Sequence, residues 1–450
     1  MERLSRSTVD GLDPALRPAI RPGEAGTGIL HLGLGAFHRA HQAVYTEDAI
    51  AAAGGDWAIA AVAPRSRDVL DALLEQDRLY SVLTLDGADV RPRVLGVHAE
   101  LLHAASDPAA VEARLADPRI RVVTLTVTEK AYRPDSAILG LLVRGLRARA
   151  ATGAPLALVS CDNLPGNGRR LRELVTAELG ESVVESVSFP STMVDRIVPA
   201  STDATCATAQ AALGLVDRAA VAAEPFSQWV VEDDFPGGRP AWERAGAILT
   251  ADVAPWERLK LRVLNGVHSA LAYLGALAGV PTIERSLALP GMRPLVEAFI
   301  RADIAPTLSP PEGVSVEGYG ESVLRRFANP ALRHRTLQVA MDGSQKLPQR
   351  LVGTIADRRA AGAVPRYAAL VLAAWMRFAR GEADDGSPLP LDDPLADRLR
   401  AAASSPRTLL ALEEVFPPGF ADDAELCAAI AEWSRSLDRH GVLGTLRALA

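Results

Sequence analysis

Side chains that can ionise or form hydrogen bonds recur at the spacing of one helix face in residues 255–278, PWERLKLRVLNGVHSALAYLGALA. Pro255 suits the first helical position, and Gly279 and Pro281 suit the end. Positions i, i+3, i+4, i+7, i+8 and i+11 are Glu257, Lys260, Leu261, Leu264, Asn265 and His268. A core-facing stripe is normally apolar, and burying polar groups without partners costs several kcal/mol. The stripe therefore predicts either a fully satisfied polar network or a face that lines a cleft.

The first half of the chain alternates short apolar runs with helical stretches, which is typical of a parallel sheet covered by helices on both faces. Residues 27–37 read as a strand followed by a glycine turn. We expect further strands at 57–64, 120–127, 154–161 and 227–235, a hairpin over 80–87 and 90–98, and helices at 39–54, 66–77 and 135–152.

The pattern changes near residue 245, after which helices dominate. We expect helices at 255–278, 290–302, 319–328, 331–341, 365–380, 393–404, 407–414 and 422–449, with solvated connectors at 305–320 and 381–394. The sequence thus predicts an α/β domain over residues 1–245 and a helical domain over residues 246–450. A cleft between two domains is a usual place for a ligand, and the polar stripe begins just past the boundary.

Composition excludes several classes of protein. The 450 residues are 48% hydrophobic and 23% charged, with a net charge of −7, so neither nucleic acid nor an anionic membrane is an expected partner. Cys161, Cys206 and Cys427 lie too far apart for a zinc spacing and fit a reducing compartment. Neither an apolar signal core nor a long apolar run occurs, and we expect a soluble cytoplasmic protein.

Gly33 and Gly35 stand where the first strand meets the first helix, in GILHLGLGAFHRAH. This is the context of a dinucleotide-binding turn, in which glycines permit the turn and let the backbone approach a pyrophosphate. His38 replaces the usual third glycine, so an ordinary strand–helix turn remains an alternative. Arg39 is either a cation near phosphate or a surface arginine. His38 and His41 have the spacing of metal ligands, but without accompanying ligands we expect no metal.

The segments after other strands carry polar residues at the edge of the sheet where ligands of α/β proteins bind. Asp162, Asn163 and Asn167 follow one strand, although Asn and Gly also make ordinary turns. Asp195 and Arg196 occupy a similar segment and could equally form a structural ion pair. Arg65 and Arg67, rather than an acid, follow the second strand, so the choice between NAD and NADP stays open.

With these motifs the sequence resembles a known family, the polyol-specific long-chain dehydrogenases, which includes mannitol 2-dehydrogenases and fructuronate reductases. The resemblance spans residues 27–440 and is carried by seven motifs in the family's order. They are HLGLGAFHRAHQAVYT, TVTEKAY, SCDNLPGNG, FPSTMVDRIVP, EPFSQWVVEDDF, KLRVLNGVHS and AMDGSQKLPQR. It implies a Rossmann-type domain, a helical domain, an active site in the cleft between them, and metal-independent hydride transfer between a nicotinamide cofactor and a secondary alcohol.

The resemblance also implies roles for individual residues. Lys260 matches the family's base, Asn265 a residue that polarises the substrate oxygen, and His268 one that orients the substrate. Asn163 resembles the second oxygen-binding amide, with Asn167 close enough to be confused with it, and Glu257 matches a carboxylate that carries protons. The expected cofactor-binding residues are Gly33, Gly35, Phe37, His38, Arg39, Thr126, Thr128 and Asp195.

These roles explain the polar stripe in physical terms. Oxidising a secondary alcohol requires removal of its hydroxyl proton, and two amide donors can stabilise the charge that develops on the oxygen. A free lysine, with a pKa of about 10.4, is a poor base at neutral pH, and burial lowers that pKa toward a useful range.

Cationic residues in the second half of the chain bear on the choice of substrate. Lys346 and Arg350 stand at i and i+4, either on a solvated helix face or as an anion-binding pair, and Arg335 lies nearby. The amino-acid sequence around Gln338 is more similar to that of fructuronate reductases, whose substrate carries a carboxylate, than to that of mannitol dehydrogenases. We therefore expect D-fructuronate and D-mannonate first, and mannitol, arabinitol or tagaturonate as alternatives.

Two other classes of function remain open. One is a non-catalytic sugar- or nucleotide-binding protein, although Lys260, Asn265 and His268 together argue against it. The other is a metal-dependent enzyme built on His38 and His41. We expect a small sugar or polyol as the partner and NAD as the cofactor, with NADP not excluded. The oligomeric state, a monomer or a small homo-oligomer, is not indicated.

Overall fold

A computed structural model describes residues 2–449 and divides the chain into two compact units, Met1–Ala254 and Pro255–Ala450. The change of pattern expected near residue 245 falls close to this division. The unit boundary lies a few residues later because strand β12 (Ile248–Thr250) pairs with β11 (Gln228–Glu232) and so belongs to the first unit.

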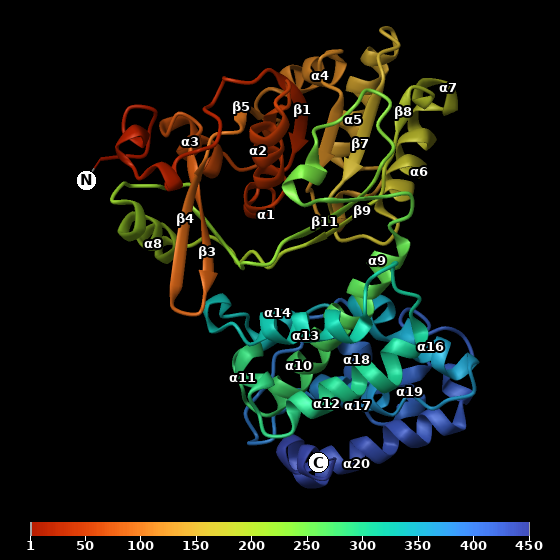
Figure 1. Ribbon diagram of the computed structural model, residues 1–450. Coiled ribbons are helices and arrows are strands. Elements are labelled where there is room, and N and C mark those ends of the chain that lie inside the picture. The colour runs from red at the N-terminus through yellow and green to blue at the C-terminus, as the bar shows by residue number, and fades with distance from the viewer. Residues whose placement is uncertain (1, 450) are drawn as a thin grey trace. The chain divides into compact units, whose positions relative to one another are not determined.

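The first unit is built on a six-stranded parallel sheet with the order β5-β2-β1-β6-β7-β8 (Figure 1). Its strands are β1 (Thr27–Leu32), β2 (Ala58–Ala63), β5 (His98–His103), β6 (Val122–Leu125), β7 (Leu156–Ser160) and β8 (Val187–Ser188). When the inserted hairpin β3–β4 is left out, this is the 3-2-1-4-5-6 order of the Rossmann fold. The predicted parallel sheet is therefore confirmed, although the edge strands β5 and β8 were not expected.

Helices cover both faces of this sheet, because alternate strand residues point to opposite sides. Ile29 packs in one core with α2 (Gln42–Ala53) and α3 (Asp68–Glu75). Leu30 packs in the other core, whose helices are α4 (Pro108–Ala116), α5 (Ala137–Ala150) and α6 (Asn167–Leu179). The site residues of this unit follow the carboxyl ends of the central strands.

Two small sheets complete the first unit. The predicted hairpin is confirmed as β3 (Tyr80–Asp86) and β4 (Asp89–Leu95), with β10 (Val221–Ala223) added beside β3. The strand expected at 227–235 is β11, which pairs with β12 and with β9 (Thr192–Asp195). The short helices α1 (Ala36–Ala40) and α7 (Glu181–Val184) and the longer α8 (Asp203–Leu213) were not expected as separate elements.

The second unit is helical, and its described residues contain only isolated bridges and no strand. It contains α10 (Gly266–Leu277), α11 (Ile283–Leu287), α12 (Met292–Phe299), α13 (Val316–Phe327), α14 (Thr336–Ala340), α15 (Gly343–Leu347), α16 (Gly353–Ala360), α17 (Arg366–Ala379), α18 (Ala396–Ala402), α19 (Pro406–Leu410) and α20 (Ala424–Arg447) (Figure 1). The almost wholly buried α17 packs against α10 and α20. None of the described helices combines the length and apolarity needed to cross a membrane.

Three expectations for this unit need correction. The helix expected at 331–341 is reduced to α14, because Arg333 adopts a left-handed conformation with φ 46°. The helical run from α15 to α16 was not predicted, because its Gly and Pro residues are typical of turns. The connector at 381–394 is not simply solvated, since Asp384 and Asp393 accept hydrogen bonds from the backbone of Val442 and Ser344.

Candidate active site

The turn between β1 and α1 has the geometry that the glycine motif predicts. Gly33 has φ 118°, and a Cβ there would lie 2.1 Å from the carbonyl oxygen of Thr126, so no other residue fits. Gly35 is exposed, and a Cβ there would meet nothing nearer than 4.0 Å. The turn therefore presents bare backbone to open space, as a bound pyrophosphate requires. Phe37 is half-buried and stacks on His41 with ring centroids 4.9 Å apart.

Two predicted cofactor residues of this turn lie in the core instead. Arg39 is buried, its guanidinium donates a hydrogen bond to the carbonyl of Ala219, and it lies over the ring of Tyr80. His38 is fully buried and stacks on His31. Neither side chain faces the exposed turn, so we correct their expected contact with the cofactor to a packing role.

The histidines form a buried stack beneath the turn. The rings of His31 and His38 are 3.4 Å apart, and Nε2 of His38 lies 3.0 Å from Nε2 of His98. His31 hydrogen-bonds to Thr124 and to the carbonyl of Gly33. Burial lowers the pKa of His31 and of His98 to about 3. The stack is therefore neutral at neutral pH.

The loop after β6 is held by a carboxylate that follows β7. Thr128 has φ 70°, which is strained for a β-branched residue. Asp162 accepts hydrogen bonds from the backbone N–H of Val127 at 3.0 Å and of Thr128 at 2.8 Å, and Tyr132 donates its hydroxyl to the same carboxylate at 2.8 Å. Burial raises the pKa of Asp162 against these donors. The sequence placed Asp162 at the sheet edge but not in this role.

The structure distinguishes Asn163 from Asn167. Asn167 is fully buried, donates to the carbonyls of Ser160, Asp162 and Thr192, and accepts from the N–H of Thr192. Both the nitrogen and the oxygen of its side-chain amide thus form hydrogen bonds within the protein. Asn163 is exposed at the carboxyl end of β7, so of the two it has the side chain that is accessible from solvent.

Asp195 ends β9 and is buried, 4% exposed, close enough to Tyr45 to influence the pKa of its hydroxyl. The neighbouring Arg196 donates to the backbone carbonyls of Glu224 and Ala40. The guanidinium of Arg196 thus braces the backbone.

Arg65 and Arg67 follow β2 as exposed side chains, and Arg67 pairs with Asp71 at 2.9 Å. The first carboxylate after β2 is Asp68, which accepts a hydrogen bond from Ser66 at 2.8 Å. This segment therefore offers both cations and a carboxylate near the end of β2, where a dinucleotide's adenosine ribose is bound in Rossmann folds.

The helix predicted at 255–278 is confirmed, with a π-helical segment inside it. It runs as α9 (Ala254–Leu259), the π segment Lys260–Asn265 and α10. In an α-helix, residues five apart point about 140° away from each other. A π segment hydrogen-bonds residue i to i+5 and so brings them to adjacent turns. Lys260 and Asn265 stand five apart at its two ends.

The predicted stripe is largely buried or half-buried. Lys260 is 7% and His268 8% exposed, while Glu257 and Asn265 are half-buried. The ring of His268 stacks on Phe327, with centroids 4.6 Å apart. These placements agree with a polar face that is shielded from bulk water.

Cations gather around His268. Burial lowers its pKa well below the usual value, and the nearby His334, Arg350, Arg326 and Lys346 lower it further. Lys346 lies on α15, and Arg350 lies in the π segment Pro348–Val352. The structure therefore places two of the three predicted substrate-binding cations, Lys346 and Arg350, near His268.

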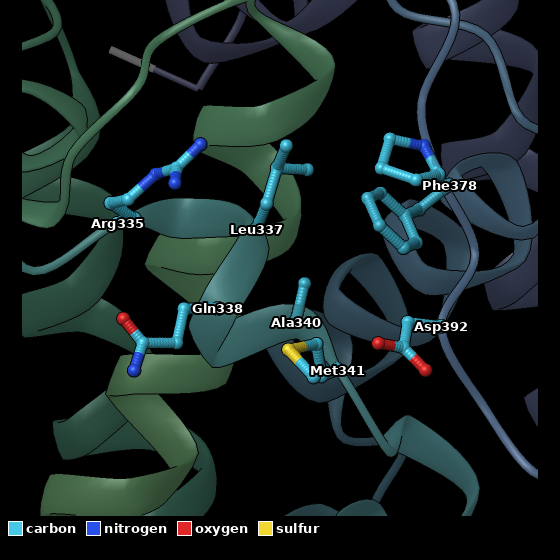
Figure 2. Close-up of a pocket in the computed structure, with 8 residues that line it drawn as sticks. Arg335, Leu337, Gln338, Ala340, Met341, Phe378 and Asp392 are labelled. Carbon is cyan, nitrogen blue, oxygen red and sulfur yellow. The ribbon is translucent and has the colours of Figure 1, made fainter.

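Arg335 lines a different feature, a pocket of about 360 Å³ in the second unit (Figure 2). Figure 2 shows Arg335 and Gln338 at one side of the view, with Phe378 and Asp392 across from them. The lining combines a cation, a carboxylate and apolar side chains, so this pocket is not a purely cationic site.

His334 and Arg326 are residues that the sequence reasoning missed. The available signals were weak: Arg326 lies within a predicted helix, and His334 directly precedes Arg335. Among residues 2–449, no group of three or more His, Cys, Asp or Glu side chains is arranged to hold a metal ion.

Comparisons with known proteins agree with this arrangement. The model of the mannitol dehydrogenase Rossmann domain matches residues 27–244, and that of the mannitol dehydrogenase C-terminal domain matches residues 252–438. D-Mannonate oxidoreductase of Escherichia coli (strain K12) is 36% identical over 482 residues, which cover 98% of this chain and 99% of that protein. Mannitol 2-dehydrogenase of Cereibacter sphaeroides is 38% identical over 461 residues, covering 93% and 95%.

Among solved structures, Pseudomonas fluorescens mannitol 2-dehydrogenase in a ternary complex with NAD and D-mannitol matches with a TM-score of 0.87 and 35% identity over 99% of both chains. Fold and relatives together define a nicotinamide-dependent dehydrogenase that acts on CH–OH groups. The chain belongs to the mannitol dehydrogenase family.

Proposed function

We propose that the protein interconverts D-mannonate and D-fructuronate with NAD, without a catalytic metal. The observation that carries this substrate is that Arg326, Lys346 and Arg350 all lie close enough to the buried His268 to lower its pKa, and that Arg350 hydrogen-bonds to the adjacent Ser269. Such a concentration of positive charge favours a ligand with a carboxylate, because charge-assisted hydrogen bonds between cations and carboxylates are the strong ones.

We propose the following roles for the reaction. Bound nicotinamide supplies the hydride acceptor or donor. In the oxidation, Nζ of Lys260 takes the proton of the secondary hydroxyl, and Glu257 passes it to water. The amides of Asn163 and Asn265 donate hydrogen bonds to the oxygen on which negative charge develops, which lowers the barrier. His268 orients the hydroxyls of the chain.

The proposed cofactor site lacks two residues that the sequence suggested, His38 and Arg39, because both are buried. Gly33, Gly35 and Phe37 form the turn, Thr126 and Thr128 lie in the loop after β6, and Asp195 ends β9. The strained loop that contains Thr128 supports a binding role, because backbone strain concentrates at functional sites.

A second substrate pair, D-mannitol and D-fructose, is favoured by the 38% identity to a mannitol 2-dehydrogenase and by the structural match. An absorbance assay with NADH or NADPH distinguishes the two. A kcat/KM for D-fructuronate at least about tenfold above that for D-fructose is expected, and the reverse ratio would refute the uronate proposal.

The role of Lys260 is tested by Lys260→Ala. We expect kcat to fall by about 10²–10⁴-fold, as for the loss of a general base, while NADH binding, followed by fluorescence, is retained. The exposed Arg258 on the same helix provides a matched control, because Arg258→Ala removes a neighbouring charge outside the stripe. An unchanged kcat in Lys260→Ala would contradict the assignment.

A further inference from the structure

Two neighbouring imidazole rings in the second unit, those of His268 and His334, each have one nitrogen without a hydrogen-bond partner. Nε2 of His268 and Nδ1 of His334 are both buried, and no described residue hydrogen-bonds to either. The two rings meet edge to face, with centroids 4.6 Å apart and an interplanar angle of 62°. Buried polar atoms normally have partners, and here two neighbouring rings, set among cations, each leave one nitrogen that a ligand hydroxyl could pair with.

The backbone holds His334 firmly in this place. Its carbonyl accepts a hydrogen bond from the N–H of Ile283 at 2.9 Å, and Thr336 donates its N–H to Pro281 at 3.1 Å. The left-handed Arg333 before it directs the chain into this bridge. The backbone that carries the imidazole is therefore fixed before any ligand arrives, and the ring packs against His268.

The charges around His334 match those around His268. Lys346 and Arg350 act on both imidazoles, and with burial they lower the pKa of His334. A neutral imidazole has one N–H donor and one acceptor nitrogen. Each ring can therefore donate to or accept from a hydroxyl group, while the cations are the natural partners of a carboxylate.

We propose that His334 is a substrate-positioning and specificity-determining residue, whose Nδ1 hydrogen-bonds the hydroxyl next to the carboxylate of the sugar acid. His268 then holds a hydroxyl nearer the reacting carbon, and Lys346 and Arg350 hold the carboxylate. This inference rests on the proposed function for the identity of the acid. The role of His334 as a contact to the substrate is a separate claim.

Two variants separate this role from simple packing against His268. His334→Phe keeps an aromatic ring against His268 but removes Nδ1. His334→Asn removes the ring but places an amide group near the position of Nδ1. If His334 binds substrate, His334→Phe raises the KM for the keto substrate by about tenfold or more. His334→Asn then has a KM closer to that of the wild type. If His334 only supports His268, the order is reversed.

The measurement is the KM for the keto substrate and for NADH, with kcat and Tm, for the wild type and both variants. We expect the KM for the keto substrate to rise in His334→Phe while the KM for NADH and the Tm stay within twofold and about 2 °C. An unchanged substrate KM in His334→Phe, or a larger loss in His334→Asn than in His334→Phe, would overturn the proposal.

The wild-type preference tests the proposed function independently. If the wild type prefers D-fructose to D-fructuronate, the proposed sugar acid is not the substrate. The KM values of the two variants are then compared with D-fructose as the substrate. The same order would still support His334 as a substrate contact, and the reverse order would still overturn it.

Discussion

Acid should destabilise the first unit through the buried histidine stack, and replacing one member should measurably reduce this effect. The pKa of His98 falls from 6.5 to about 3 on burial, as does that of His31. At about 1.4 kcal/mol per pH unit, each corresponds to roughly 5 kcal/mol. Nε2 of His38 faces Nε2 of His98 at 3.0 Å, so two charged rings would point N–H groups at each other.

The sign follows from proton binding. Between pH 6.5 and about 3 the unfolded chain binds protons that the folded stack does not, so unfolding takes up protons. The stabilisation by neutral His98 is fully present above pH 6.5 and is lost as the pH falls toward 3. Glu47 acts in the opposite direction, because burial raises its pKa to about 7. A comparison of variants at the same pH cancels that contribution.

The variant is His98→Phe, which keeps a ring of similar size and removes the proton uptake of one histidine. We expect the slope of the free energy of unfolding against pH, between pH 4 and 6, to fall by about 1.4 kcal/mol per pH unit. The loss of the partner of His38 lowers stability by a further 1–3 kcal/mol or so at every pH.

The assay is urea unfolding of the full chain, followed by fluorescence at a series of pH values. His440→Phe is the matched control, because the side chain of His440 is exposed to water in the folded protein as it is in the unfolded chain. Equal slopes for the wild type and His98→Phe would refute the reasoning.

Two further predictions concern pairs of similar residues. Gly35→Ala should raise the Kd for NADH by about tenfold and leave the Tm unchanged, because the added Cβ would meet no protein atom nearer than 4.0 Å. Gly33→Ala should instead lower the Tm, because its Cβ would lie 2.1 Å from a carbonyl oxygen. A normal Kd in Gly35→Ala would contradict the proposed turn. Asn167→Ala should lower the free energy of unfolding by about 1–3 kcal/mol or more, because its amide is hydrogen-bonded within the fold. Asn163→Ala should keep the stability and lower kcat by about 10²–10³-fold. The opposite pattern in melting and steady-state assays would reverse their roles.

Features that depend on local pattern were predictable from the sequence. The apolar runs predicted the central strands. The long helix with Lys260, Asn265 and His268 was predicted from the proline at its start and the glycine at its end. The two-residue strand β8 carries too little pattern to be recognised. The π segment was also missed, because the spacing of an α-helix was assumed throughout.

Contacts between residues distant in the chain could not be predicted. Arg39 looked like a phosphate ligand because it follows the glycine turn, but its side chain reaches Ala219, which is 180 positions away. Asn167 and Asn163 have the same side chain and nearly the same position, and only the partners of Asn167 distinguish them. His334 carried no motif that would separate it from the neighbouring surface residues.

The carboxylate of Asp162 joins two loops that follow different strands. It holds the N–H groups of Val127 and Thr128 after β6, and it directly precedes Asn163 after β7. A displacement of either loop must therefore break a hydrogen bond to Asp162 or carry the other loop with it. The predicted cofactor-binding threonine and the predicted oxygen-binding asparagine thus form one mechanical unit, in which their spacing is preserved when the loops move.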